Sequence, residues 1–174
     1  MFRSTYVALK QKKIDLVIKV FNRLGLPLKI FGDGPELKYL KKIAKPNIQF
    51  LGRITEEQKI DLMNKALAFI NPQLEDFGIT AIESMAAGRP VIAYSAGGAQ
   101  ETVIDGETGI FFKKQTWESL FDAVLNFHPT NWDSAKIRTH AEKFSEELFK
   151  EKMKKFVEDK YEEFKAGLVQ NKLF

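Results

Sequence analysis

The chain has 174 residues, a length that suits one domain with a substantial hydrophobic core. Apolar residues make up 44% of it, and the absence of cysteine excludes disulfide bonds, thiolate zinc sites and a cysteine nucleophile. The formal net charge of +4 suits an anionic ligand or an anionic membrane surface, or reflects lysines on solvated helices. Since apolar runs are far shorter than a membrane span, and the first residues lack an apolar leader segment, we expect neither a span nor a signal peptide.

Helical and extended segments alternate along the chain, which predicts βαβ units and a mostly parallel sheet. The predicted strands are residues 5–9 (the weakest), 28–31, 48–51, 66–70, 91–94 and 109–112. The predicted helices are residues 13–25, 35–44, 56–65, 79–87 and 117–127.

Several of these boundaries have a physical cause in the sequence. Gly25 suits the left-handed residue that ends a helix. Thr55 and Gln58 have the spacing of a capping box, which starts a helix at residue 56. Gly88 and Pro90 end the helix over 79–87 and precede a strand.

After residue 127 the strand pattern stops, and residues 131–166 are predicted to be helical in two pieces. The second piece carries an apolar stripe at helical spacing, formed by Leu148, Phe149, Met153, Phe156, Val157 and Phe164. This stripe either packs on the sheet layer or in part reaches a second domain. We therefore divide the chain into a domain over 1–130 and a helical extension over 131–174 that packs on it.

Three glycine or lysine segments follow predicted strands. Gly32 and Gly34 precede a helix, but Leu37 replaces the third glycine of a dinucleotide fingerprint, so we favour a tight turn that a flat base could approach. Arg53 follows a strand and either contacts a base edge or lies on a surface turn. Lys10, Lys12 and Lys13 follow the first strand and either bind a pyrophosphate or form a solvated face.

The most specific segment contains Glu75 and Glu83, eight positions apart, with Gly78 at a helix start between them. The free amide groups of a first helical turn favour a phosphate. Glu83 could accept hydrogen bonds from a vicinal diol such as ribose, and Glu75 from sugar hydroxyls beyond the phosphates. Alternatively, Glu75 favours the helix dipole and Glu83 is exposed on the helix, or the two acids form a hydrolytic pair.

Residues 75–93 resemble the E-x7-E signature of retaining GT-B glycosyltransferases of the family 4 type (group 1). Residues 31–37, 50–53 and 97–112 extend the resemblance in the same order, from about Lys12 to Phe127. Within this family, the chain most resembles mannosyltransferases of the O-antigen type, which act in polysaccharide biosynthesis.

The resemblance implies one half of a GT-B fold, a Rossmann-like three-layer α/β sandwich with a parallel sheet of about six strands. That half binds the donor, so the N-terminal acceptor domain is expected to be absent and the fragment alone inactive. The implied reaction transfers a hexose, with mannose expected, from a nucleoside diphosphate sugar with retention. GDP-mannose is the favoured donor and a UDP-sugar the alternative, with neither a metal nor another cofactor.

The resemblance also implies partners. The expected acceptor is a glycan or a lipid-linked molecule, bound through the missing domain. Nucleic acid is not an expected partner. The location is cytoplasmic, with peripheral association of the full enzyme at the inner face of the membrane. Two alternatives stay open: a stand-alone nucleotide-sugar-binding module that pairs with a separate acceptor-domain chain, and a sugar-nucleotide epimerase.

Site residues follow from the resemblance position by position. Glu75 is the catalytic residue that contacts the donor sugar, and Glu83 holds the ribose hydroxyls. The remaining donor-binding residues are Gly78, Ile79 and Thr80 at the diphosphate and ribose, Lys12 at the diphosphate, and Gly32 and Arg53 at the base. The family usually has an arginine five residues before the lysine, where this chain has Val7.

Overall fold

The computed structural model describes residues 5–9 and 13–170. The chain forms two compact units, one ending at Ala141 and one beginning at Glu142. Each unit is described by itself below. No helix in the described ranges combines the length and the apolar character that crossing a membrane requires.

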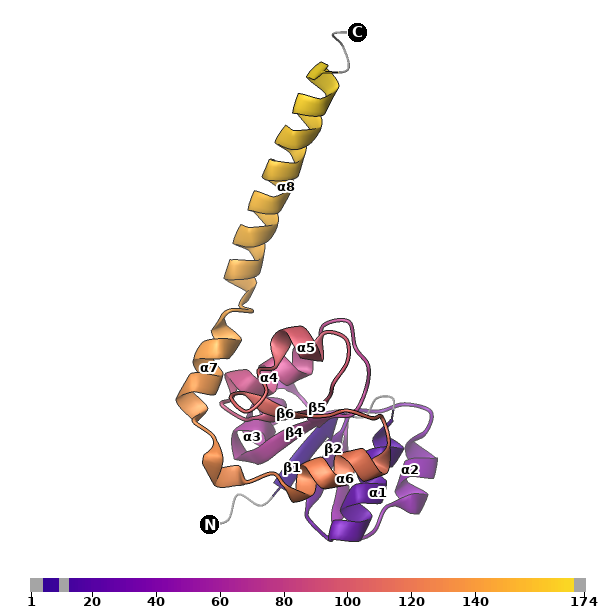
Figure 1. The fold of residues 1–174 in the computed structure, drawn as a ribbon. Coiled ribbons are helices and arrows are strands. Elements are labelled where there is room, and N and C mark those ends of the chain that lie inside the picture. The colour runs from indigo at the N-terminus through magenta and orange to yellow at the C-terminus, as the bar shows by residue number, and fades with distance from the viewer. Residues whose placement is uncertain (1–4, 10–12, 171–174) are drawn as a thin grey trace. The chain divides into compact units, whose positions relative to one another are not determined.

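The first unit is built on one six-stranded sheet (Figure 1). Its strands are β1 (Thr5–Leu9), β2 (Leu28–Phe31), β3 (Ile48–Gly52), β4 (Ala66–Asn71), β5 (Val91–Tyr94) and β6 (Gly109–Phe112). They lie in the order β3-β2-β1-β4-β5-β6 and every pairing is parallel. This confirms the predicted Rossmann-like sheet, including its weakest strand, β1. The strand order reverses beside β1, where such folds bind ligands.

Helices cover both faces of the sheet (Figure 1). They are α1 (Ile14–Leu24), α2 (Leu37–Ile43), α3 (Glu56–Lys65), α4 (Ile79–Ala86), α5 (Ala99–Thr102), α6 (Trp117–Leu125) and α7 (Ser134–Glu142), with a short 3₁₀ turn at Pro129–Asn131. The five predicted helices before residue 130 are confirmed. We did not predict α5 or the 3₁₀ turn, because three or four residues are too few to show a helical period.

Two hydrophobic clusters fill the space between the three layers. One joins α1 and α6 to one face of the sheet, and the other joins α3, α4 and α7 to the opposite face. Strand β5 shows the division, since Ile92 belongs to the first cluster and Val91 and Ala93 to the second. Successive side chains of a strand point to opposite faces, so the apolar run 91–93 is buried on both sides.

The predicted helix ends have the expected geometry. The Thr55 hydroxyl accepts from the Gln58 amide at 3.2 Å, and the Gln58 side chain accepts from the Thr55 amide at 2.9 Å. This reciprocal pair is the predicted capping box of α3. Gly25 ends α1 in the left-handed conformation, with φ of 67°.

The first compact unit extends past the predicted domain boundary at residue 131. Helix α7 belongs to it, because Ile137 and Ala141 are buried in the second cluster. The second unit consists mainly of α8 (Glu146–Gln170). Ion pairs between neighbouring turns line α8, among them Lys160–Glu163 at 2.7 Å and Lys165–Glu162 at 3.2 Å. The two predicted helical pieces are thus α7 and α8.

The junction of α4 with α7 gives a stability prediction at Gly88. Its φ is +71°, and an added Cβ would lie 2.9 Å from the Ser134 carbonyl oxygen. Gly88→Ala therefore combines backbone strain with a clash, and should lower the free energy of unfolding by about 2–4 kcal/mol in urea titrations.

Gly25→Ala is the matched control, because Gly25 also has a positive φ but an added Cβ meets nothing within 4 Å. We expect this substitution to lower the free energy of unfolding by about 1 kcal/mol, from strain alone. Equal losses in the two variants would contradict the tight contact between Gly88 and α7.

Candidate functional site

The loops at the carboxyl edge of the sheet are joined in two pairs by backbone hydrogen bonds. The Gly32 amide donates to the Gly52 carbonyl at 2.7 Å, which joins the ends of β2 and β3. The Gly98 amide donates to the Glu75 carbonyl at 2.8 Å, which joins the loops after β5 and β4. In an open parallel sheet, ligands bind at this edge.

The first pair of loops brings Gly32 close to the segment that carries Arg53. Arg53 Nε lies 3.8 Å from Asp33 Oδ2, in an ion pair whose arginine side chain is 88% exposed. An exposed pair of this kind adds little stability, so the guanidinium can turn toward a ligand. We did not predict Asp33 as its partner from the sequence.

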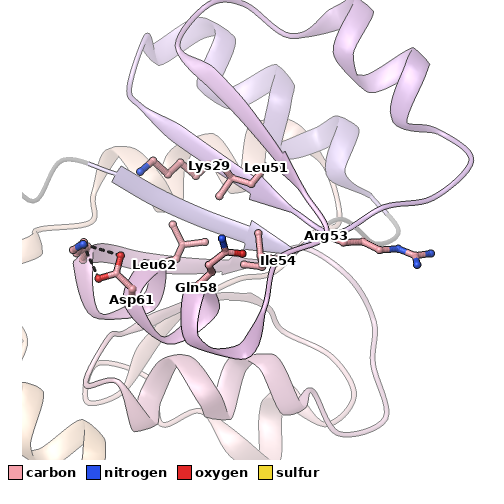
Figure 2. A pocket seen from close by; sticks show the side chains of 8 residues that line it. Lys29, Leu51, Arg53, Ile54, Gln58, Asp61 and Leu62 are labelled. Carbon is pink, nitrogen blue, oxygen red and sulfur yellow. Dashed lines mark hydrogen bonds and ion pairs between the residues drawn. The ribbon is translucent and has the colours of Figure 1, made fainter.

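Arg53 also lies at one end of a pocket of about 380 Å³ between α3 and the edge of the sheet formed by β2 and β3. Leu51, Ile54 and Leu62 form its apolar part, and Lys29 lines it from β2. Figure 2 shows the Arg53 side chain pointing away from these residues. Arg53 therefore lines one end of the pocket, while its guanidinium extends away from the apolar part.

The second pair of loops brings Glu75 to the N-terminus of α4. Gly78 precedes this helix with φ of +86°, and a Cβ placed on it would lie 3.0 Å from Glu75 Oε2. Ile79, at the first position of α4, is 65% exposed and Thr80 is partly exposed, so the start of the helix borders solvent. The amide groups of a first turn lack carbonyl partners within the helix and favour an anion there.

Glu75 is half-buried, and its partner is the uncharged side chain of Asn71 at the end of β4. Burial raises the pKa of Glu75 above its ordinary value, although the hydrogen bond with Asn71 opposes this shift. We did not identify Asn71 from the sequence; its position at the carboxyl end of a predicted strand was the available signal.

The segment after β5 packs tightly against the backbone of Glu75 and Asp76. A Cβ on Gly97 would lie 2.4 Å from the Glu75 carbonyl oxygen, and one on Gly98 would lie 2.3 Å from that of Asp76. Contacts this short leave no room for a side chain at either position. Gly97 and Gly98 therefore support the backbone that carries Glu75.

Glu83 faces α3 rather than the loop that holds Glu75. Its Oε1 lies 2.8 Å from Lys59 Nζ, and the same ammonium group lies 2.8 Å from Glu56 Oε2. Burial lowers the pKa of Lys59, but the hydrogen bonds and charges of Glu56 and Glu83 outweigh it and raise the pKa above the ordinary value. No sequence pattern showed that Lys59 would face α4.

Val7 and Lys12 are the two remaining positions that the resemblance singled out. Val7, which stands where the resemblance would place an arginine, is fully buried in the second cluster. The other position, Lys12, lies outside the described residues, so its proposed contact with a diphosphate stays a prediction.

The chain is similar in sequence to glycosyltransferases. A family model described as Glycosyl transferases group 1 matches residues 6–144. An uncharacterized glycosyltransferase of Methanocaldococcus jannaschii is 30% identical over 158 residues, which are 88% of this chain and 45% of that protein. Alpha-1,3/1,6-mannosyltransferase ALG2 of Dictyostelium discoideum is 40% identical over 98 residues, which are 52% of this chain and 23% of that protein.

Among solved structures, the chain is similar to HepE of Anabaena in complex with UDP. The TM-score is 0.73 at 18% identity, and the match covers 89% of this chain and 48% of that one. At this identity the similarity concerns the fold alone. The chain spans less than half the length of each of the three proteins named here.

The raised pKa of Glu75 predicts a pH dependence of stability. Because the folded chain holds this proton to higher pH than the unfolded chain, ionising Glu75 as the pH rises above 4.5 removes stability. Glu75→Gln cannot ionise, so its free energy of unfolding relative to wild type should increase between about pH 4 and pH 7 in urea titrations.

Asp76→Asn is the control, since it removes the same charge from the exposed neighbouring residue. We expect its stability relative to wild type to change less over this range. A difference between Glu75→Gln and wild type that stays constant with pH would contradict the assignment.

Proposed function

Since this chain belongs to the glycosyl transferases of group 1, we propose that it is the donor-binding domain of a retaining, family 4 type hexosyltransferase. Its substrate is a nucleoside diphosphate sugar. The observation that carries the proposal is the close approach of the Glu75 side chain to Gly78, which puts a carboxylate beside the exposed start of α4. One small region thus offers amide donors for phosphate oxygens and a carboxylate acceptor for sugar hydroxyls.

Each group at this edge has a role in the proposal. The amide groups at Gly78, Ile79 and Thr80 hold the diphosphate, with Lys12 as the cation. Electrostatic stabilisation of the departing diphosphate then promotes transfer, without a metal ion or another cofactor. Glu75 accepts hydrogen bonds from the hexose and orients it, and so acts as the catalytic residue.

The nucleoside part of the donor lies on the neighbouring loops in this proposal. Glu83 accepts hydrogen bonds from the ribose, while Gly32 and Arg53 receive the base. The hydrogen bond between Gly32 and Gly52 supports this, since it brings the two base-binding loops side by side. Glu75 and Glu83 therefore bind and orient the donor and do not form a hydrolytic pair.

Mannose is the preferred hexose and GDP-mannose the preferred donor. The similarity to the mannosyltransferase ALG2, at 40% identity, supports mannose. The fold shared with HepE, whose structure contains UDP, keeps a UDP-sugar as the alternative donor. Both donors present the same diphosphate and ribose to α4.

The acceptor pocket lies in this proposal on polypeptide outside these 174 residues, because the chain spans less than half of each relative. That polypeptide binds a glycan or a lipid-linked acceptor, at the cytoplasmic face of a membrane. The same coverage favours a second candidate, a stand-alone donor-binding module that pairs with a separate acceptor-domain chain. Co-purification of a separate acceptor-domain chain that restores transfer would distinguish this candidate.

Binding of GDP or UDP tests the role of Glu83. We expect weak binding to the isolated chain, and Glu83→Ala should weaken it by about 1–3 kcal/mol through the loss of charged hydrogen bonds. Isothermal titration calorimetry measures both affinities. Glu57→Ala, which removes an exposed acid from α3, should leave the affinity unchanged. Equal affinity of Glu83→Ala and wild type would remove Glu83 from the site.

Donor preference and activity are tested separately on the purified chain. A nucleotide-sugar panel should raise the apparent melting temperature by mass action, most with GDP-mannose. Release of nucleoside diphosphate in the presence of glycan acceptors should stay at the background rate, because the proposal assigns the acceptor pocket to other polypeptide. Robust turnover by the 174-residue chain would contradict this assignment of a donor-binding half.

A further inference from the structure

One ion pair joins α3 to α4 and is more buried than the pair that Lys65 and Asp61 form within α3. Lys59 on α3 and Glu83 on α4 are 24 residues apart in sequence, and their charged atoms lie 2.8 Å apart. The lysine side chain is only 16% exposed and the glutamate 34%. Lys65 and Asp61, on the same helix, form a pair that is 73% and 62% exposed.

Helix packing explains why an ammonium group can be held there. Met63, on the same helix as Lys59, is buried in the second cluster. Lys59 reaches Glu83 from one side and Glu56 from the other, so two carboxylates satisfy it. A partly buried cation needs such partners, since burial without them destabilises the charged form.

The pair remains accessible to a ligand. Glu56, Lys59 and Glu83 line a groove of about 350 Å³ between the two helices. The other lining includes Ile60 and Ala87, which present mainly apolar surface. In such a groove water screens the carboxylate less than on an open surface, so its hydrogen bonds to a ligand are stronger.

We propose that Lys59 is a positioning residue for the nucleotide, which holds the Glu83 carboxylate in the orientation that accepts the ribose diol; this rests on the proposed function. A carboxylate has about four lone-pair sites, and the ammonium group occupies one of them on Oε1. The remaining sites suffice for two ribose hydroxyls. Lys59 and the ribose therefore bind Glu83 at the same time.

Glu56 also pairs with Lys59 and so holds the lysine in place when a ligand binds to Glu83. Its carboxylate lies 2.8 Å from Lys59 Nζ and is 79% exposed, at the start of α3. It gives Lys59 a second partner on its own helix. The ammonium group is then held between the two helices whether or not a ribose is bound.

The test compares ribonucleotides with 2′-deoxyribonucleotides, because a purely structural role of Lys59 would not change the ratio of their affinities. Calorimetry with GDP, UDP and their 2′-deoxy forms gives this ratio for each variant. We expect wild type to prefer the ribonucleotide about tenfold, the effect of one charge-assisted hydrogen bond. Glu83→Gln should lose most of this preference.

In Lys59→Met the preference should fall to about twofold or less, while Lys59→Arg should keep most of it because it still donates to Glu83. Lys65→Met is the matched control, since it removes a lysine from the same helix, and it should bind like wild type. If Lys59→Met does not fold, Lys59→Gln, whose shorter and uncharged side chain no longer forms the ion pair with Glu83, is compared with the double variant Lys59→Gln/Glu83→Gln. The single variant should then have a preference as low as that of the double variant.

The outcomes separate this inference from the proposed function. A full ribonucleotide preference in Lys59→Met or Lys59→Gln, together with its loss in Glu83→Gln, would overturn the role of Lys59 and leave the proposed function standing. No binding of any nucleoside diphosphate by wild type would overturn the proposed function and this inference with it.

Discussion

The close approach of the loop after β5 to the loop after β4 is the contact on which the rest of the site depends. Gly98 donates to the Glu75 carbonyl, and neither Gly97 nor Gly98 has space for a side chain. This support sets the backbone that carries Glu75 over Gly78, where α4 begins. Glu83 lies on α4 itself, which is packed into the second cluster through Ala81 and Met85.

The two glutamates have different electrostatic environments, although the same signature contains them. Glu75 is half-buried beside an uncharged amide, and burial raises its pKa. Glu83 faces an ammonium group that is itself shared with Glu56. A pair of acids that hydrolyses a glycosidic bond would need to face one another across a cleft. Glu83 instead faces α3, which favours separate binding roles on one donor molecule.

Much of the fold was predictable because each element carries its own local signal. The alternation of apolar runs, the capping box at Thr55 and the glycine at residue 25 all act over a few neighbouring residues. The structure therefore confirms the six strands, the five helices before residue 130 and their order. Helix α5 is too short for such a signal. The unit boundary after Ala141 depends on the burial of Ile137, which is a contact with distant residues.

The parallel βαβ architecture, the helix N-terminus after Gly78 and the two acids around it could be read from the sequence alone, because they follow from short-range periodicity and spacing. The tertiary structure decided which side chains meet. It paired Glu83 with Lys59, joined Gly98 to Glu75, and buried Val7 where the family resemblance led us to look for an arginine. The two pairings join residues that are 24 and 23 positions apart, and the burial of Val7 depends on the strands on either side of β1. They are formed only when the layers pack, so no local pattern in the chain reports them.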